Sequence, residues 1–448
     1  MIELHNSLSR AVEVFVPQDP GCVSMYVCGP TVYDVPHLGN ARPAVIFDTL
    51  YRLLRHTYGE HSVEFARNFT DIDDKIMERA AANGESIQTL TERVIRQYHE
   101  VTDALGCLRP NHEPRATAYI APIIGSIAML LLNKHAYISE GHVLFDVTSY
   151  PSHGALSRHL QADLQSGQHR VAEASYKRNQ ADFVLWKPST PDQPGWDASF
   201  GRGRPGWHIE CSAMIESIFA DQTIDIHAGG ADLRFPHHDC EISQFACSHH
   251  KPDRKLANYW LHNGMLLVEG EKMAKSAGNF FTVPDVVARG YTGPEIRLAL
   301  LQTHYRSPLD FTDATLEGAR TTLNRWRDAL LPYTSMAPLN NPAAQGAIEA
   351  LSSDLNTPLA ITALHESASM LNTTKNPSVA QGMMYALDLL GFCWKQASVN
   401  EEEQALLDQR KAAREAGDYA LSDRLRDALG ARGIHVKDMR DGTLWWRS

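Results

Sequence analysis

The fold is decided by the stretch Cys28-Gly-Pro-Thr-Val-Tyr-Asp-Val-Pro-His-Leu-Gly-Asn-Ala-Arg42. Just before it, Val23, Met25 and Val27 alternate with other residues, a pattern that predicts a buried strand with these three side chains on one face. After it, apolar residues recur at helical spacing from Pro43. A proline is tolerated in the first turn of a helix, because its missing N–H would have no partner there. The stretch is therefore predicted to join a strand to a helix N-terminus, where α/β sheets bind anions.

The composition is that of an ordinary globular protein. Hydrophobic residues make up 43% of the 448 positions and charged residues 21%, which predicts about two to four domains with large cores. The longest apolar candidate, Ile123 to Leu132, is too short to span a membrane and contains Gly125. The N-terminal residues show no secretory signal. We therefore expect a cytoplasmic protein without a membrane partner.

Cysteine usage and charge exclude further classes. The seven cysteines are odd in number and thinly scattered, and no C-x-x-C pair occurs, which argues against a disulfide framework and excludes a zinc ribbon. The formal net charge of −11 argues against a protein that coats nucleic acid nonspecifically. It leaves room for a shape-specific RNA binder with a local basic groove.

The distribution of periodic patterns predicts the domain organisation. Strands and helices alternate over residues 1–145 and again over 206–292, which indicates one parallel sheet flanked by helices in an α/β fold. Residues 146–205 are rich in Gly, Ser, Gln and His, with two proline-bearing clusters, and are interpreted as an insertion. Residues 293–398 show only helical patterns, and a polar junction separates them from a small C-terminal region, 399–448.

Three local elements are predicted with defined bounds. Residues 136–147 are interpreted as a hairpin, and Gln404 to Leu429 as one amphipathic helix. The segment from Gly433 to Arg447 is predicted to be a second hairpin, turning at Asp441-Gly442.

A second candidate for chemistry is the loop Glu271-Lys-Met-Ala-Lys-Ser-Ala-Gly-Asn279. Its lysines, Lys272 and Lys275, are spaced i, i+3 among small residues, so both can point at one polyanion as mobile point charges. The alternative is a solvated surface pair, since lysine is mostly exposed.

A third candidate is a metal site. His237 and Glu241 are spaced i, i+4 and would face the same way on a helix, so both can reach one ion. Cys211 and Cys28 are candidates to complete the set from the ends of neighbouring strands. Spacing alone leaves the choice open among Cys28, Cys211, His237, His238, Cys240, Glu241, Cys247, His249 and His250. Buried filler thiols and a surface helix rich in histidine remain the alternative.

Together these segments resemble a known family. His37-Leu-Gly-Asn40 is similar to the HIGH signature of class I aminoacyl-tRNA synthetases, and Lys272-Met-Ala-Lys-Ser276 to their KMSKS signature, in the expected order. Within that class the chain resembles the cysteinyl-tRNA synthetases over essentially its whole length. The segments that carry this likeness are Cys28-Gly-Pro-Thr-Val-Tyr-Asp34, Arg67-Asn-Phe-Thr-Asp-Ile-Asp-Asp-Lys75, Gly206-Trp-His-Ile-Glu-Cys-Ser-Ala-Met214, Phe235-Pro-His-His238, Asp354-Leu-Asn-Thr-Pro-Leu-Ala360 and Asp441-Gly-Thr-Leu-Trp-Trp-Arg447. The departures are Asn40 for the second HIGH histidine, Ala274 in the lysine loop, and Asp239-Cys240 between His237 and Glu241.

The resemblance implies a Rossmann-like catalytic domain with an insertion, a helical bundle and a C-terminal anticodon-binding domain. It also implies one Zn²⁺ that selects cysteine over serine, held by Cys28, Cys211, His237 and Glu241. Zinc binds a thiolate well and a neutral hydroxyl poorly, whereas size alone separates such substrates by only about 1–3 kcal/mol.

The same resemblance implies the roles of the remaining site residues. His37, Asn40, Lys272 and Lys275 would act in catalysis, and His37, Asn40, Asp232 and Lys275 would bind ATP with its Mg²⁺. Asp232 belongs to a G-x-D-x4-H pattern from Gly230 to His237, although a helix N-cap is the alternative for it. Thr31 and Trp207 would contact the substrate, with a core tryptophan as the alternative for Trp207.

The implied reaction is ATP-dependent activation of L-cysteine followed by transfer to tRNA(Cys), by a monomer. Arginines of the C-terminal helix, and Trp445 and Trp446, would meet the anticodon end. The arginines are Arg410, Arg414, Arg424 and Arg426. An ordinary solvated helix with a tryptophan-anchored hairpin is the alternative.

Two other functions are weighed against this one. A cysteine ligase acting on a small amine, as in mycothiol synthesis, would share the adenylation chemistry but would have no use for an anticodon-binding tail. A non-catalytic zinc-bearing RNA-binding protein would have no reason to keep His37, Lys272 and Lys275.

Overall fold

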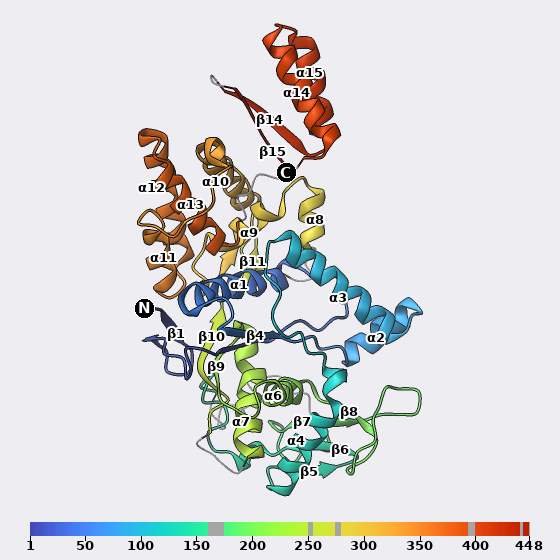
Figure 1. Ribbon diagram of the computed structural model, residues 1–448. Coiled ribbons are helices and arrows are strands. Elements are labelled where there is room, and N and C mark those ends of the chain that lie inside the picture. Colours follow the sequence, from blue (N-terminus) through green and yellow to red (C-terminus); the bar gives the residue numbers. More distant parts are fainter. Residues whose placement is uncertain (160–173, 250–253, 274–278, 393–398, 440–441, 448) are drawn as a thin grey trace.

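A central four-stranded parallel sheet, with helices on both faces, organises the molecule (Figure 1). The computed structural model describes residues 1–448 except 160–173, 250–253, 274–278, 393–398, 440–441 and 448. The strand order is β10-β9-β3-β4, and every neighbouring pair is parallel. The bounds are β3 (Val23–Val27), β4 (Val63–Arg67), β9 (Ile224–Gly230) and β10 (Ala257–Asn263). This confirms the predicted α/β fold with a parallel sheet.

The alternation of side chains along β3 assigns its two faces. Val23, Met25 and Val27 are buried in one core with α1 (Leu38–Tyr58), as predicted. Tyr26, on the opposite face, is buried with side chains of α6 (Trp207–Ile218) and α7 (Asp239–Ser248). Because side chains alternate along a strand, Cys28 follows Tyr26 to the α6 and α7 side, while the chain leads on into α1.

The start of α1 corrects one prediction. The helix begins at Leu38 with His37 as its N-cap, so Pro43 lies inside the helix and not in its first turn. The Oδ1 atom of Asn40 accepts the backbone N–H of His37 at 3.1 Å, as in a capping box. This local bond satisfies an N–H at the helix start and stabilises a helix that begins five residues earlier than the proline suggests.

The insertion between the two halves of the sheet contains a separate antiparallel sheet. Its order is β5-β6-β7-β8, with β5 (Ala136–Ser139) and β6 (His142–Phe145) forming the predicted hairpin. The other two strands are β7 (Phe183–Pro188) and β8 (Gly203–Pro205). The proposed domain boundaries, including 146–205 for the insertion, remain predictions.

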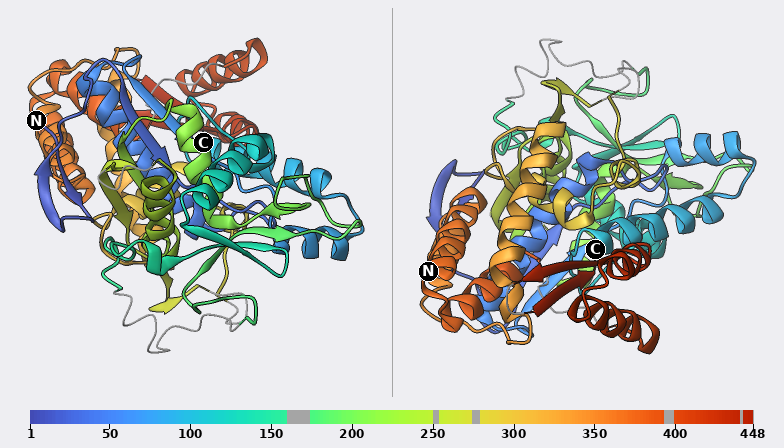
Figure 2. Two further views of the ribbon diagram at one scale, coloured as in Figure 1. Left: turned by 90° about the horizontal axis from the view of Figure 1, so that it is seen from below. Right: turned by 90° about the horizontal axis from the view of Figure 1, so that it is seen from above.

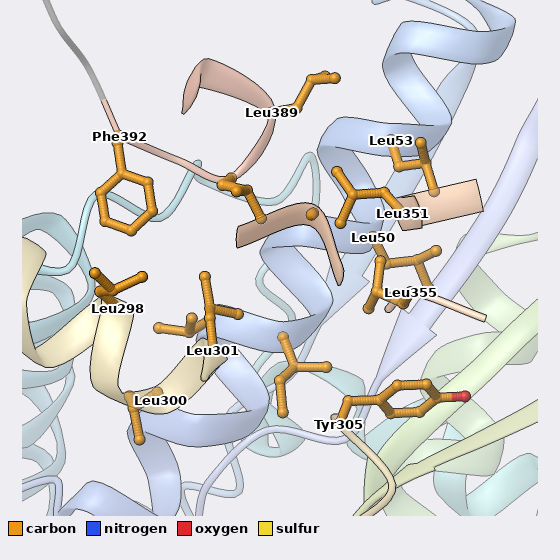
Figure 3. Close-up of a cluster of buried hydrophobic side chains, with 14 of the residues drawn as sticks. Leu50, Leu53, Leu298, Leu300, Leu301, Tyr305, Leu351, Leu355, Leu389 and Phe392 are labelled. Atoms are coloured by element: carbon orange, nitrogen blue, oxygen red, sulfur yellow. The ribbon is translucent and has the colours of Figure 1, made fainter. Parts of the chain in front are cut away.

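A helical part packs directly on α1. Leu50 and Leu53 of α1 lie in one core with Leu298 and Leu301 of α9 (Gly293–Leu301) and with Leu351, as Figure 3 shows. In the same region, the fully buried Arg297 donates to Asp48 of α1 at 2.5 Å. The helices α11, α12 and α13 also lie beside the N-terminal strands (Figure 2). The catalytic sheet and the helical part therefore share a hydrophobic core.

The C-terminal region corrects a second prediction. The segment predicted as one helix forms α14 (Glu401–Glu415) and α15 (Tyr419–Gly430), which pack against each other. Gly417 adopts a φ of +76°, and Asp418 caps α15 by accepting the N–H of Leu421 at 3.0 Å. Glycine takes such a backbone conformation without steric cost, so the chain turns there.

The predicted terminal hairpin is confirmed. It consists of β14 (Ile434–Met439) and β15 (Gly442–Arg447), with Met439 opposite Gly442. Gly442, predicted as part of the turn, is therefore the first residue of β15. Asp441, and the side chains of Trp445 and Trp446, lie outside the described part of the structure.

The remaining described elements connect these layers. None of the helices in the described part of the chain combines the length and the hydropathy that a membrane span requires. The strands are β1 (Glu3–Asn6), β2 (Ala11–Val14), β11 (Leu266–Val268), β12 (Glu271–Lys272) and β13 (Leu309–Asp310). The helices are α2 (Asp74–Asn83), α3 (Ile87–Ala104), α4 (Ile120–Leu132), α8 (Val283–Ala288), α10 (Asp313–Leu330), α11 (Gln345–Ser352), α12 (Thr357–Thr374) and α13 (Pro377–Leu389).

Candidate active site

A cavity of about 570 Å³ opens at the carboxyl ends of β3, β9 and β10. This edge of an open parallel sheet is where such folds bind ligands. Predicted site residues from separate parts of the sequence line it together: Cys28, Thr31, His37, Asn40, Trp207 and Asp232. A larger cavity, of about 640 Å³, lies against α4 and α6, and its described lining includes one of the metal candidates that spacing left open, His249.

The four predicted metal ligands form one buried cluster beside this cavity. The ligand atoms of Cys28, Cys211, His237 and Glu241 all lie within 4.8 Å of one another. The Cys28 Sγ atom lies 3.7 Å from Cys211 Sγ and 3.5 Å from Glu241 Oε1. His237 Nε2 lies 2.8 Å from the same Glu241 oxygen. Two thiols, an imidazole and a carboxylate therefore converge on one point.

Of the other candidates that spacing left open, the fold separates three from this point and keeps His238 beside it. Cys240 and Cys247 are buried in a different core, together with side chains of the β5–β8 sheet. His249 forms a separate group with Glu216 and Asp221, in the larger cavity. His250 lies outside the described residues. His238 belongs to a second possible group that shares Cys28 and Glu241 and adds His227.

In the absence of metal, the electrostatics of the cluster favour an ionised Glu241 and Cys211, a protonated His237 and a neutral Cys28. Burial opposes ionisation of the Glu241 carboxyl, but the neighbouring His227 and His237 lower its pKa well below the usual range. Burial also disfavours a charged His237, yet Glu241 and Cys211 raise the pKa of this imidazole to about 10. The hydrogen bond from Cys28 lowers the pKa of the Cys211 thiol to about 6, whereas burial raises that of Cys28.

Two histidines hold the ligands in place, and neither was predicted. His227 Nε2 bonds the second carboxylate oxygen of Glu241, so that both oxygens have an imidazole partner. His208 Nδ1 lies 2.9 Å from His237 Nδ1. His227 had a signal in the sequence, because a histidine ends the alternating run Thr223-Ile-Asp-Ile-His227.

Trp207 forms a wall of the cavity directly over the cluster. Its ring stacks on His237, with centroids 4.4 Å apart and planes inclined by 21°. The side chain is 38% exposed, so it is no core tryptophan. It lies in the first turn of α6, which also carries Cys211.

The N-terminus of α1 forms another part of the cavity wall. His37 and Asn40 line the cavity there, and so does the short segment Gly230–Leu233 that follows β9. Asp232 lies within that segment and is exposed, while Gly230 occupies the N-cap position. The N-cap alternative for Asp232 is therefore wrong.

The described flanks of the lysine loop also line the cavity. Lys275 lies outside the described residues, and so does the side chain of Lys272, whose backbone belongs to β12. The residues on either side of the undescribed stretch, Met273 and Phe280, both line the cavity. Phe280 packs edge-on against His37 with ring centroids 5.1 Å apart. The loop thus begins and ends beside the N-terminus of α1.

Three residues to which the sequence analysis assigns no role also line the cavity. Arg67, the last residue of β4, and Lys75, in the first turn of α2, line the cavity together with Tyr33. The Lys75 ammonium lies 5.7 Å from the centre of the Tyr33 ring. Arg67 and Lys75 had a signal in the sequence, because they belong to one of the segments that carry the family resemblance.

The C-terminal arginines correct a further prediction. Arg410 is fully buried and donates to both oxygens of Asp438, at 2.9 and 2.8 Å. Arg414 and Arg426 contact the same carboxylate. These three side chains hold β14 against the helices, and a buried Arg410 cannot meet phosphate. Arg424 is exposed.

Comparisons with known proteins agree with this architecture. Residues 14–321 match the model of the tRNA synthetases class I (C) catalytic domain, residues 347–392 a DALR domain, and residues 397–447 the cysteinyl-tRNA ligase anticodon binding domain.

Among curated proteins, the chain is similar to cysteine–tRNA ligases. That of Ruegeria sp. (strain TM1040) is 47% identical over 98% of this chain and 95% of the relative. That of Acidiphilium cryptum is 48% identical, over 100% and 99%.

Solved structures show likeness of fold alone. Methionyl-tRNA synthetase of Mycobacterium tuberculosis has a TM-score of 0.57 at 14% identity, covering 82% of this chain and 89% of that one. A leucyl-tRNA synthetase complex from Agrobacterium radiobacter has a TM-score of 0.59 at 12% identity, covering 85% and 84%.

Proposed function

Since the chain belongs to the cysteine–tRNA ligase family of class I aminoacyl-tRNA synthetases, we propose that its cavity activates L-cysteine with ATP and passes the cysteinyl group to tRNA(Cys). The observation that carries this proposal is the joint position of two chemistries in one cavity. A sulfur-rich ligand cluster at Cys28 and an anion-binding helix start at His37 both border this cavity. Both belong to the segment from Cys28 to Arg42.

The buried cluster fits one zinc ion. Its donor set of two thiols, an imidazole and a carboxylate is one that zinc accepts. Two thiolates on a tetrahedral zinc with Zn–S bonds of about 2.3 Å lie about 3.8 Å apart. The 3.7 Å between the sulfurs of Cys28 and Cys211 matches that separation. His227 supports the set from outside, as the hydrogen-bond partners of metal ligands commonly do.

When bound, the zinc supplies a soft Lewis acid that holds the cysteine side chain as a thiolate and leaves the hydroxyl of serine poorly bound. The chain's own residues form the rest of the pocket. Trp207 covers the cluster with its ring and limits the space for the substrate side chain. Thr31, on the same wall as Cys28, is placed to contact the amino acid.

The ATP is placed at the N-terminus of α1. His37 and Asn40 contact its phosphates, where the helix end favours negative charge, and Asp232 accepts from a ribose hydroxyl. Asn40 can serve although its oxygen caps the helix, because its amide nitrogen remains a donor. A carboxylate oxygen of cysteine attacks the α-phosphorus, and pyrophosphate leaves. Lys272 and Lys275 are proposed to neutralise the charge that develops on it, with Mg²⁺ accompanying the nucleotide.

In the second step a terminal ribose hydroxyl of the tRNA attacks the activated carbonyl, and AMP leaves. We assign the anticodon end to the C-terminal unit of α14, α15, β14 and β15, which matches the anticodon-binding model. A chain that only joined cysteine to a small amine would have no use for such a unit, so that alternative is not favoured. A monomeric state and a cytoplasmic location, both expected from the sequence, are part of the proposal.

The proposal is tested by two activities of the full chain. Cysteine-dependent exchange of labelled pyrophosphate into ATP reports the first step, and charging of tRNA(Cys) reports both. We expect both activities. Exchange without charging would support the small-amine alternative, and the absence of cysteine-dependent exchange would contradict the proposal.

A further inference from the structure

The buried guanidinium of Arg42 lies behind the cavity, in the second turn of α1. The side chain is 1% exposed, and the residue belongs to the cavity lining. It makes three short hydrogen bonds to backbone carbonyls: to Gly264 at 2.7 Å, to Met265 at 2.6 Å and to Ser307 at 2.6 Å. One side chain thus ties the first turns of α1 to two loops that are distant in the sequence.

Those two loops support the strand that leads into the lysine loop. Gly264 and Met265 follow β10, line the cavity and continue into β11 and β12. Ser307 precedes β13, which pairs in parallel with β11 through Leu266 and Leu309. Gly264 has no room for a side chain, because a Cβ there would lie 2.4 Å from the Ser307 carbonyl oxygen. The Arg42 bonds therefore fix the base of the β11–β12 hairpin relative to the start of α1.

The charge of Arg42 is balanced differently from that of a comparable arginine. Arg297 is equally buried, and it pairs with Asp48 at 2.5 Å. Around Arg42, the described residues place no carboxylate within 4.0 Å of the guanidinium. Burial lowers the pKa of Arg42 to about 10, so it stays cationic at neutral pH. A buried cation without a carboxylate partner is costly and calls for an anion in its surroundings.

We propose that Arg42 is a positioning residue for the ATP-dependent step: it fixes the base of the lysine loop against the α1 N-terminus, and its positive charge is balanced by the nucleotide phosphates. The inference rests on the proposed placement of ATP beside His37 in the cavity. Arg42 acts through the backbone of residues 264, 265 and 307. The cysteine pocket, at the Cys28 cluster, should not depend on it.

The test compares Arg42→Met and Arg42→Lys with Arg297→Lys as the control variant. We expect Arg42→Met to raise the KM for ATP about tenfold and to lower kcat for cysteine-dependent exchange about 10- to 100-fold, with the KM for cysteine within about twofold. Arg42→Lys keeps the charge but not the forked donor, so it should recover part of the loss. Arg297→Lys should lower the melting temperature and leave the KM for ATP unchanged.

A second measurement, the thermal shift with ATP, keeps the test valid if a variant is poorly stable. Saturating ATP should raise the melting temperature of the unmodified protein and of Arg297→Lys, and should raise that of either Arg42 variant clearly less. An unchanged KM for ATP and an unchanged thermal shift in Arg42→Lys and Arg42→Met would overturn the inference, as would an equal ATP defect in Arg297→Lys. His37→Ala separates the two claims. If it leaves ATP use intact, the placement of ATP is wrong, whereas a defect in His37→Ala alone would refute only the role of Arg42.

Discussion

Cys28 and Cys211 are separated by 183 residues of chain, yet their sulfur atoms lie 3.7 Å apart at the carboxyl edge of the central sheet. Cys28 ends the face of β3 that packs on α6, and Cys211 lies in the second turn of α6. His237, just before α7, and Glu241, in the first turn of α7, close the group. The four positions are brought together by the parallel order of the sheet, and each of them is required for the proposed zinc site.

Removal of one thiol should therefore remove the metal. We expect Cys211→Ser to lower the zinc content, measured by elemental analysis of the purified protein, from one ion per chain to a small fraction. Loss of a ligand or its support typically weakens metal affinity at least 10- to 100-fold. Cys247→Ser is the matched control, because Cys247 is equally buried but lies in a different core. Equal zinc contents in the two variants would refute the ligand assignment.

Glu216 predicts a pH dependence of stability. Burial in the wall of the larger cavity, against the hydrogen bond from Ser126 and with a smaller contribution from Asp221, raises the pKa of its carboxyl from 4.5 to about 7. The folded chain then holds this proton more tightly than the unfolded chain. The stability contributed is present in full below about pH 4.5 and is lost as the pH rises through 7. A shift of this size corresponds to about 3 kcal/mol.

The measurement is urea denaturation at several pH values between 4.5 and 8. Glu216→Gln should lack this contribution, so its midpoint should fall less with rising pH than that of the unmodified protein. Parallel pH profiles for the two proteins would contradict the prediction.

Asp438 should hold the C-terminal unit together. Its carboxylate pairs with the buried Arg410, and Arg414 and Arg426 share it. Loss of one partner of a buried ion pair typically costs about 3–5 kcal/mol. We expect Asp438→Ala to loosen this unit and to weaken charging of tRNA(Cys) strongly, while cysteine-dependent pyrophosphate exchange stays within about twofold, because the cavity lies elsewhere.

Glu402→Ala is the control for this prediction. It removes an exposed ion pair with Arg432 in the same unit, a contact worth about 0–1 kcal/mol. Deletion of residues 399–448 should reproduce the Asp438→Ala phenotype more severely. Equal losses in exchange and in charging would contradict the assignment of this unit to tRNA.

The sequence predicts the sheet and the site better than it predicts local boundaries. Alternation along Val23 to Val27 identifies a strand and its faces, because the period of two is a local property. Cys211 lies in α6 and not, as predicted, at the end of a strand. Spacing could not select Cys28 and Cys211 as partners, since their contact depends on how α6 packs against β3. The family resemblance supplied that choice, and the fold brings the implied ligands together.

The errors have physical causes that individual residues illustrate. The family resemblance implies only a phosphate contact for Asn40. Its side chain also caps α1, and because of this cap the helix begins before Pro43. The apolar stripe predicts one continuous helix through Gly417, although this glycine is followed directly by the capping residue Asp418. The helical pattern predicts that Arg410 lies on the solvated face of the helix. Arg410 nevertheless lies three residues after the buried Leu407 and three before the buried Ala413. Its partner Asp438 lies on another element, beyond the reach of helical periodicity.

The central claim is that the segment from Cys28 to Asn40 holds the substrate sulfur at one end and the ATP phosphates at the other. The most direct test measures kcat/KM for pyrophosphate exchange with cysteine and with serine, in Cys28→Ser and His37→Ala. Cys28→Ser should lose the preference for cysteine over serine about 100-fold, and zinc chelation of the unmodified protein should have the same effect. His37→Ala should slow exchange about 100-fold for both amino acids and keep the preference. Identical changes of rate and preference in the two variants would contradict the account.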